Sequence, residues 1–157
     1  MTELSMMRLA AFEADQNLET KDGGPFGCVI AKESQVLVSA HNQVLKDNDP
    51  TAHAEITAIR KATKKLGTFD LSGYTLYTSC YPCPMCLGAI IWSNIKTVYY
   101  GNTAKNAASI GFRDDYIYQF IQNQSEHEDV LKMISFDREE TLPAFNAFKD
   151  ESEKVIY

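Results

Sequence analysis

The chain carries, at residues 81–86, the stretch Tyr81-Pro82-Cys83-Pro84-Met85-Cys86. A second stretch, at residues 51–55, reads Thr51-Ala52-His53-Ala54-Glu55. Imidazole nitrogen and cysteine sulfur are donors that zinc prefers, so His53, Cys83 and Cys86 predict a zinc site. Glu55 follows two residues after the histidine, where a carboxylate can stand beside the metal without binding it.

Hydrophobic periodicity and breaker residues divide the rest of the chain into helices and strands. We predict helices at residues 4–18, 53–66, 84–92, 104–110, 114–121 and 139–149, and strands at 26–32, 35–41, 74–79, 96–100 and 130–136. The first helix is predicted from an apolar stripe made of Leu4, Met7, Ala11, Ala14 and Leu18. The alternation of elements predicts an α/β fold, a three-layer α/β/α sandwich around a mixed five-stranded sheet.

Length and charge exclude several classes of protein. A chain of 157 residues is expected to form a single domain, residues 1–157, with a core of its own. Acidic residues outnumber basic ones 21 to 15, which argues against a nucleic-acid partner. The basic run Arg60-Lys61 and Lys64-Lys65 is expected to be the solvated flank of a helix rather than a phosphate-binding patch.

The location of the protein is predicted from two further features. The N-terminal residues have neither the basic nor the apolar region of a signal peptide, and no apolar run approaches the length of a membrane span. Cys80, Cys83 and Cys86 fall within seven residues, which favours metal chemistry in a reducing compartment. We therefore expect a cytoplasmic protein with no membrane partner.

Two other metal sites compete with an open zinc site. A closed, structural zinc site needs a fourth donor, and the candidates are Cys28, Cys80, His41 and His127. An iron–sulfur cluster would use Cys80, Cys83 and Cys86, with Cys28 as the fourth cysteine. The open site is favoured because a closed one leaves Glu55 without a role. His41 and His127 have no motif around them and are expected to be surface or satisfied histidines.

An open zinc site with a neighbouring carboxylate predicts hydrolysis. Zinc held by three protein ligands lowers the pKa of a bound water toward ~7. Glu55 can take the proton of that water, and deliver it to a ring nitrogen and then to departing ammonia. The pattern H-x-E followed by P-C-x-x-C is the signature of zinc-dependent nucleobase deaminases, and both halves are present.

Longer motifs around these residues resemble those of the cytidine deaminase superfamily. They are residues 48–55, residues 78–80 and residues 82–90. Within the superfamily the chain most resembles the bacterial guanine deaminases, through residues 23–27, residues 111–118 and a C-terminal Tyr157. This resemblance runs nearly end to end. It implies one Zn²⁺ per subunit and the conversion of guanine to xanthine and ammonia.

The resemblance also implies how a small purine substrate is held. Its substrate-binding positions are Phe26, Asn42, Ala54, Asp114 and Tyr157. Asn42 would hydrogen-bond the purine, Asp114 would hold its far edge, Phe26 would pack on its face and Tyr157 would close the pocket. From spacing alone, Phe26 is interpreted as a core aromatic and Asp114 as a helix N-cap. The resemblance further implies a homodimer whose C-terminal segments are exchanged.

One departure from the family keeps other substrates open. The family usually has an acid before the Pro-Cys pair, where this chain has Tyr81. A guanosine-like nucleoside or another aminated heterocycle is therefore an alternative substrate. A tRNA adenosine deaminase is a rival because it shares the zinc signature, and cytosine deaminase is a further rival. A structural zinc-binding module is the non-enzymatic alternative. Glu139, Glu140 and Glu151 are all possible second acids, and the sequence does not choose among them.

Overall fold

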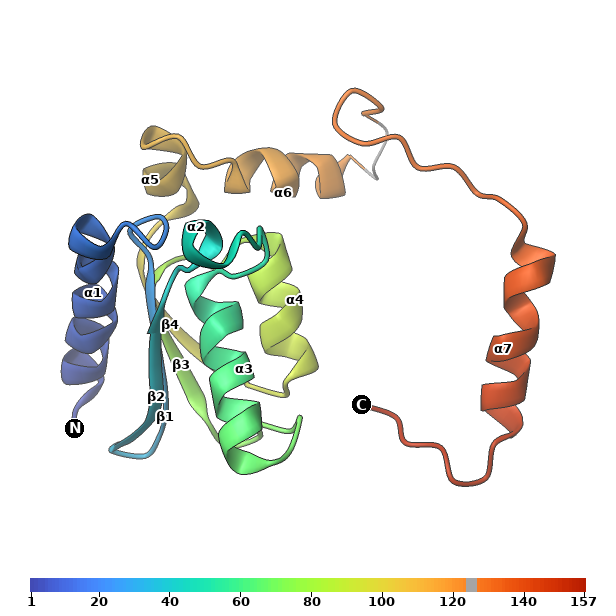
Figure 1. The fold of residues 1–157 in the computed structure, drawn as a ribbon, viewed down its shortest axis with the longest axis horizontal. Helices are drawn as coiled ribbons and strands as arrows, with labels where there is room; N and C mark the ends of the chain where they lie inside the picture. The colour runs from blue at the N-terminus through green and yellow to red at the C-terminus, as the bar shows by residue number, and fades with distance from the viewer. Residues whose placement is uncertain (124–126) are drawn as a thin grey trace. The chain divides into compact units, whose positions relative to one another are not determined.

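The structure, a computed structural model, describes residues 1–123 and 127–157. The chain divides into two compact units, Met1–Tyr118 and Gln119–Tyr157. Within the described ranges, no helix is both long enough and apolar enough to cross a membrane. Figure 1 labels the elements used below.

The first unit is built on a mixed sheet of four strands. These are β1 (Gly27–Lys32), β2 (Gln35–His41), β3 (Thr75–Cys80) and β4 (Thr97–Asn102), in the order β2-β1-β3-β4. β1 is antiparallel to β2 and β3, whereas β3 and β4 are parallel. The strands predicted at 26–32 and 35–41 are confirmed and pair as a hairpin, in whose turn Glu33 has a positive φ of 54°. The sheet has four strands, so the prediction of five is wrong.

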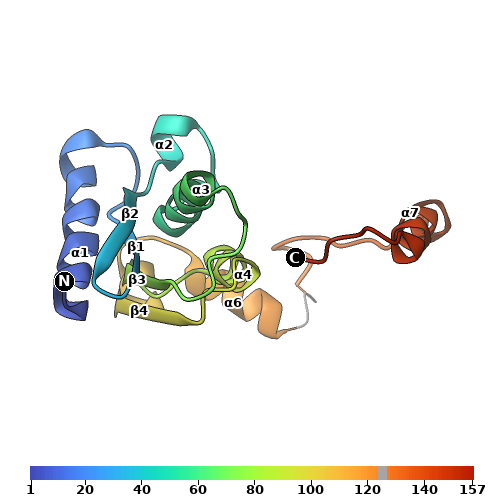
Figure 2. The same cartoon turned by 90° about the horizontal axis from the view of Figure 1, so that it is seen from below.

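Helix α1 (Glu3–Thr20) covers one face of this sheet (Figures 1 and 2). A capping box at Thr2 begins it, and its buried residues are Met6, Ala10, Ala14 and Asn17. The predicted stripe is right at Ala14 and Met7, which are buried or partly buried, but wrong at Leu4 and Leu18, which are 59% and 61% exposed. Small side chains face the sheet at this point because the helix lies very close to it. A Cβ on Gly27 would lie 2.0 Å from the carbonyl oxygen of Ala10.

Helices α3 (Ala54–Leu66) and α4 (Pro84–Trp92) cover the opposite face (Figure 2). The core between them and the sheet includes Cys28, Ile30, Leu76 and Ile90, all nearly or fully buried. Both predicted helices are confirmed. Gly67 ends α3 in the left-handed conformation, at φ 68°, and Pro84 occupies the first turn of α4, where its missing N–H costs nothing.

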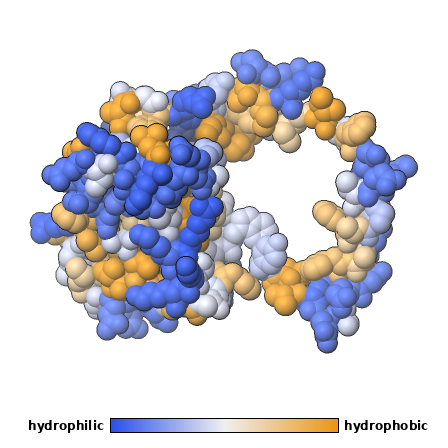
Figure 3. Space-filling view, in the orientation of Figure 1, coloured by the Kyte–Doolittle hydropathy of each residue, from blue (hydrophilic) through white to orange (hydrophobic). Residues whose placement is uncertain are grey.

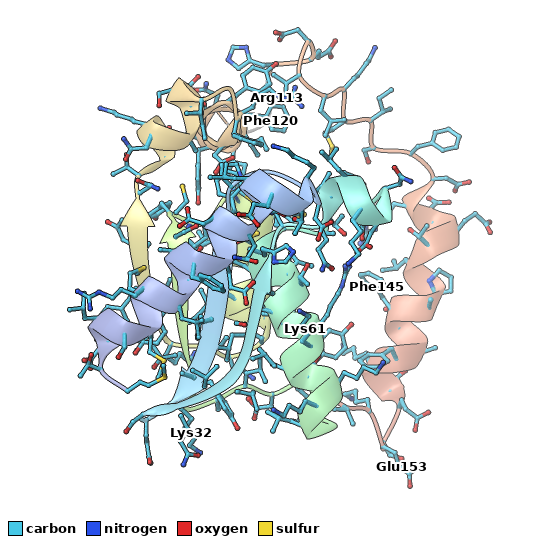
Figure 4. All side chains as sticks on the ribbon, turned by 60° about the vertical axis from the view of Figure 1, so that its left-hand side comes forward. Lys32, Lys61, Arg113, Phe120, Phe145 and Glu153 are labelled. Carbon is cyan, nitrogen blue, oxygen red and sulfur yellow. The ribbon has the colours of Figure 1, made fainter. Side chains whose placement is uncertain are left out.

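The basic flank of α3 covers the outer edge of the sheet. Lys61 and Lys65 donate from Nζ to the carbonyls of Ser39 and Leu37 on β2, at 3.3 and 3.0 Å (Lys61 is labelled in Figure 4). Arg60 instead pairs with Asp49 at 3.3 Å. The two lysine bonds occupy carbonyls of β2, an edge strand that would otherwise be open to pairing with another chain.

Three shorter helices complete the first unit: α2 (Val44–Asp47), α5 (Ala104–Ser109) and α6 (Asp114–Gln122), whose last turn belongs to the second unit. α5 and α6 agree with the helices predicted there. α2 follows β2 closely, and together with the loop after it leads the chain to His53.

The second unit contains helix α7 (Arg138–Asp150), which confirms the helix predicted at 139–149. The strand predicted at Val130–Phe136 is wrong, because these residues have no regular structure. Their apolar side chains favour a strand, but a strand also needs a neighbouring strand to accept its hydrogen bonds. No described residue from 119 onward is buried, and exposed apolar groups recur along this segment, Phe145 among them (Figures 3 and 4).

Candidate active site

Two helix N-termini meet at one point of the first unit. His53 is the N-cap of α3 and Cys83 is the N-cap of α4, with Cys86 in the first turn of that helix. The Nδ1 atom of His53 lies 3.5 Å from the Sγ atoms of both Cys83 and Cys86. The three donor atoms all lie within 4.8 Å of one another. Two tetrahedral zinc ligands, one nitrogen and one sulfur, stand about 3.5 Å apart, so these donors fit a zinc ion.

The local electrostatics favour thiolate at this point. The hydrogen bond from Cys86, together with His53, lowers the pKa of Cys83 to about 4. The same hydrogen bond and burial raise the pKa of Cys86 above its ordinary value, so one thiol of the pair ionises far more easily than the other. The hydrogen bond to Cys83 raises the pKa of His53. Unsatisfied N–H groups at helix starts stabilise such an anion further.

Glu55 stands beside the three donors without being one of them. It lies in the first turn of α3 and is 6% exposed. Its Oε1 accepts a hydrogen bond from Thr78 Oγ1 at 2.8 Å, and its Oε2 lies 3.5 Å from Cys86 Sγ. Burial raises the pKa of this carboxyl. One oxygen is thus held by β3 while the other faces the candidate metal site.

Among the described residues, the group of potential metal ligands has only three members, which removes the alternative sites with a fourth donor. Cys80 instead donates to the Thr103 carbonyl at 3.6 Å, and burial raises the pKa of its thiol to about 11. Cys28 is fully buried in the core beneath α3. The same geometry excludes the iron–sulfur interpretation, because Cys80 and Cys28 do not join the pair.

Both remaining histidines have other partners. His41 lies between two carboxylates, with Nδ1 2.9 Å from Glu13 and Nε2 3.0 Å from Asp22. His127 belongs to the second unit and lies 4.0 Å from Asp129. The expectation that they are satisfied or surface histidines is confirmed.

A cavity of about 370 Å³ opens over Glu55 and the metal donors. Its lining residues are Gly23, Gly24, Phe26, Asn42, Val44, Leu45, Pro50, His53, Glu55, Cys80, Tyr81, Cys83, Phe112 and Asp114. Three of the five predicted substrate-binding residues are therefore here: Phe26, Asn42 and Asp114. Ala54 is fully buried in the core and does not line the cavity, whereas Tyr157 lies in the second unit with 72% of its surface exposed.

An aromatic pair forms one wall of the cavity. The rings of Phe26 and Phe112 meet edge to face, with centroids 4.8 Å apart and an interplanar angle of 83°. Gly24 makes room for them, since a Cβ there would lie 2.7 Å from Phe112 and 2.9 Å from Phe26. Phe112 had no predicted role. The feature of the sequence that could have indicated Phe112 is its position, two residues before Asp114 and directly after Gly111, which has a positive φ.

Tyr81 also lines the cavity, and an aromatic cluster fixes it there. Its ring lies 5.0 Å from that of Tyr100 and 6.2 Å from that of Tyr118. The Tyr118 hydroxyl in turn donates to the carbonyl of Pro82 at 2.6 Å, just before the first metal-donor cysteine. Tyr81 thus packs in an aromatic cluster that also supports the loop carrying Cys83.

Comparison with known proteins agrees with this geometry. Residues 1–102 match the family described as the cytidine and deoxycytidylate deaminase zinc-binding region. The chain belongs to this family. The matched region contains all three metal donors and Glu55, so the zinc predicted from the sequence is the metal of the family.

Three relatives show how far the similarity of this deaminase extends. Guanine deaminase from Bacillus subtilis is 41% identical over 157 residues, which is 100% of both chains. The crystal structure of guanine deaminase from B. subtilis superposes with a TM-score of 0.93 and covers 100% of this chain and 99% of that one. The tRNA-specific adenosine deaminase of B. subtilis is 36% identical over 101 residues, 64% of this chain and 63% of that protein.

Proposed function

We propose that the protein is a zinc-dependent deaminase that hydrolyses guanine to xanthine and ammonia. The observation that carries the proposal is a buried carboxylate, Glu55, facing a His-Cys-Cys donor group in a cavity of a chain that matches guanine deaminase over its full length. A match that covers only part of the chain, as with the tRNA-specific enzyme, supports the shared chemistry but not the shared substrate.

His53, Cys83 and Cys86 would hold the zinc. Bound zinc supplies a Lewis acid that lowers the pKa of a water molecule toward ~7. Glu55 receives the proton of that water on Oε2, because Oε1 is occupied by the hydroxyl of Thr78. It passes this proton to a ring nitrogen. It then takes the second proton of the water, from the hydroxyl now bonded to carbon, and delivers it to the amino group, which leaves as ammonia. Each turnover forms one C–O bond and breaks one C–N bond, with no redox change.

The cavity lining supports a flat, polar-edged substrate. Phe26 offers a ring to the face of a base. Asn42 would use Nδ2 to donate, since its Oδ1 already accepts from the Val44 N–H at 3.0 Å. Asp114, which lines the cavity, would accept from a ring N–H, whereas Ala54 is fully buried and makes no contact there. Such a set is suited to a free purine, and the net charge of −6 argues against an RNA loop as its carrier.

The second unit supports a homodimer. Large apolar side chains in it remain more than half exposed: Leu131, Met133, Ile134, Phe136, Phe145, Val155, Ile156 and Tyr157. A segment of this composition, none of whose described residues is buried, needs another surface to stabilise it. We propose that the segment is exchanged between two subunits, that Tyr157 contacts substrate held by the other subunit, and that the dimer is cytoplasmic.

The substrate is tested by measuring ammonia release from guanine, guanosine, adenine, cytosine and cytidine, with zinc content determined on the same sample. The expected result is turnover of guanine with one zinc per chain. Turnover of a different compound would overturn the guanine assignment and leave a zinc deaminase. A zinc-loaded protein that releases no ammonia from any substrate would favour a structural zinc module.

The exchange is tested by mixing two inactive variants. One carries Glu55→Ala with an intact C-terminus, and the other lacks residues 155–157 but keeps Glu55. If Tyr157 acts across the dimer, co-refolded mixtures regain activity, since one site per mixed dimer is complete. Absence of recovery in mixtures proved to contain mixed dimers would place the tail on its own subunit.

A further inference from the structure

Helix α1 carries a buried amide that the proposed chemistry does not use. Asn17 is 3% exposed, whereas the other buried residues of α1 are apolar. It does not line the cavity, so it makes no substrate contact there. Burying an amide costs free energy unless its donors and its acceptor are hydrogen-bonded, so the partners of Asn17 decide whether its burial is favourable.

Both donors and the acceptor oxygen of the Asn17 side chain are hydrogen-bonded. Nδ2 donates to the carbonyl of Gly24 at 2.7 Å and to the carbonyl of Asn42 at 2.9 Å. Oδ1 accepts from Thr20 Oγ1 at 3.1 Å. The hydroxyl therefore fixes the amide with its nitrogen toward the two carbonyls. Asn17 thus ties the loop after α1 to the end of β2.

The two residues held by Asn17 both line the cavity, and Asn42 also packs against the loop that contains Gly24. Asn42 donates its N–H to the carbonyl of Phe26 at 3.0 Å, and its Oδ1 accepts from the N–H of Val44 at 3.0 Å. A Cβ on Gly23 would lie 2.0 Å from this Oδ1, so the Asn42 amide packs directly on the glycine loop. With its oxygen occupied, Asn42 presents Nδ2 as a donor to the cavity.

We propose that Asn17 is a positioning residue that sets the place of the Asn42 amide and of the Gly24 loop, and thereby the affinity for the base. The proposal rests on the proposed function in one respect, namely that Asn42 contacts the substrate. Asn17 acts through backbone carbonyls and never touches the ligand. A residue with only a structural role would change stability but would leave substrate affinity alone.

The first test is Asn17→Asp, which keeps the shape of the side chain and replaces its two donors by an oxygen facing two carbonyls. KM for guanine is expected to rise about tenfold or more, while kcat stays within about twofold and zinc content is unchanged. Met6→Ala is the matched control, because it opens a hole in the same helix face away from the cavity. It is expected to lower Tm and leave KM unchanged.

A double-mutant cycle separates positioning from independent effects. If Asn17 acts through Asn42, then Asn17→Asp adds no further rise in KM to an Asn42→Ala variant. If the KM increases of the two single variants multiply in the double variant, the proposal is overturned. It is also overturned if Asn17→Asp leaves KM unchanged and only lowers Tm, as Met6→Ala does. Should Asn17→Asp not fold, Thr20→Val at an exposed position removes the bond that fixes the amide, together with a longer one of 3.4 Å that the hydroxyl accepts from the Asp22 N–H. A smaller rise in KM supports the proposal, and no rise overturns it.

A failure of the guanine assignment can be distinguished from a failure of the proposal for Asn17. If the ammonia panel identifies a substrate other than guanine, the same cycle is run with that compound, and its outcomes keep their meaning. If Asn42→Ala leaves KM unchanged, the contact between Asn42 and substrate is absent, and a rise in KM in Asn17→Asp must then come from another route, which overturns the proposal.

Discussion

Thr78 Oγ1 on β3 donates a hydrogen bond of 2.8 Å to Glu55 Oε1 on α3. Both groups are buried, so the bond is shielded from water and holds the carboxylate with one oxygen toward the metal donors. The Thr78 bond lowers the pKa of Glu55 and thereby opposes the upward shift that burial causes. The Glu55 carboxylate is thus held by the strand that precedes the cysteine loop.

Thr78→Val is therefore expected to lower kcat about tenfold, the cost of losing a hydrogen bond to a charged group. It also removes a contribution that lowers the pKa of Glu55. The base then needs a higher pH to be ionised, and the acidic limb of the kcat/KM profile moves to higher pH. Thr78→Ser keeps the hydroxyl and is the matched control. A valine variant with the profile of the serine variant would remove Thr78 from this role.

Glu55→Gln tests the proton carrier itself. The amide keeps the size of the side chain and can still accept from Thr78, but it cannot carry a proton between water and base. We expect one zinc per chain, an unchanged fold by circular dichroism, and a loss of turnover by a factor of about 10² or more. Near-full activity, or a variant that no longer binds zinc, would contradict the assignment.

Tyr118→Phe probes the support of the cysteine loop. The substitution keeps the ring next to Tyr81 and removes only the hydroxyl that donates to the Pro82 carbonyl. Supports of this kind typically change metal affinity by 10–100-fold, so we expect zinc to bind about tenfold more weakly in chelator competition at fixed pH. Tyr116→Phe, on the same helix, is the control. Equal affinities in the two variants would show that the hydroxyl does not act on the metal site.

Asp49→Asn tests the loop that leads to His53. The N–H and hydroxyl of Thr51 donate to Asp49 at 2.8 and 2.7 Å and lower its pKa. A carboxyl with a depressed pKa in the folded state stabilises the fold above its unfolded pKa of about 3.9, and this stability is lost as pH falls through the folded pKa. The wild type should therefore exceed Asp49→Asn in Tm at pH 7, with the gap closing toward pH 3. A gap independent of pH would exclude the charge as its cause, and Asp47→Asn is the neighbouring control.

Local signals in the sequence predicted much of the first unit. Gly67 and Pro84 marked helix boundaries that the structure confirms, because a left-handed cap and a first-turn proline are properties of single residues. The site was predictable for the same reason, since His53, Glu55, Cys83 and Cys86 are recognisable by type and spacing. Phe112, Thr78 and Asn17 were not, because each acts through a partner far away in the chain.

The wrong predictions share a physical origin. The apolar stripe predicted for α1 did not account for how closely the helix packs on Gly27, and that close approach puts Ala10, which the stripe omitted, on the buried face beside Ala14. Residues 130–136 have the side chains of a strand, yet pairing depends on a neighbouring edge that no local pattern specifies.

By itself the sequence determined the order of the strands and of every helix except α2 in the first unit, the donor set for zinc and the carboxylate beside it, because these depend on residue type and short spacing. Only the tertiary structure decided that Thr78 holds one oxygen of Glu55, that Phe112 and Tyr81 join the cavity, and that Asn17 ties Gly24 to Asn42. Hydrogen bonds and packing contacts between distant segments form only after the sheet brings these segments together, and their partners cannot be inferred from local propensity.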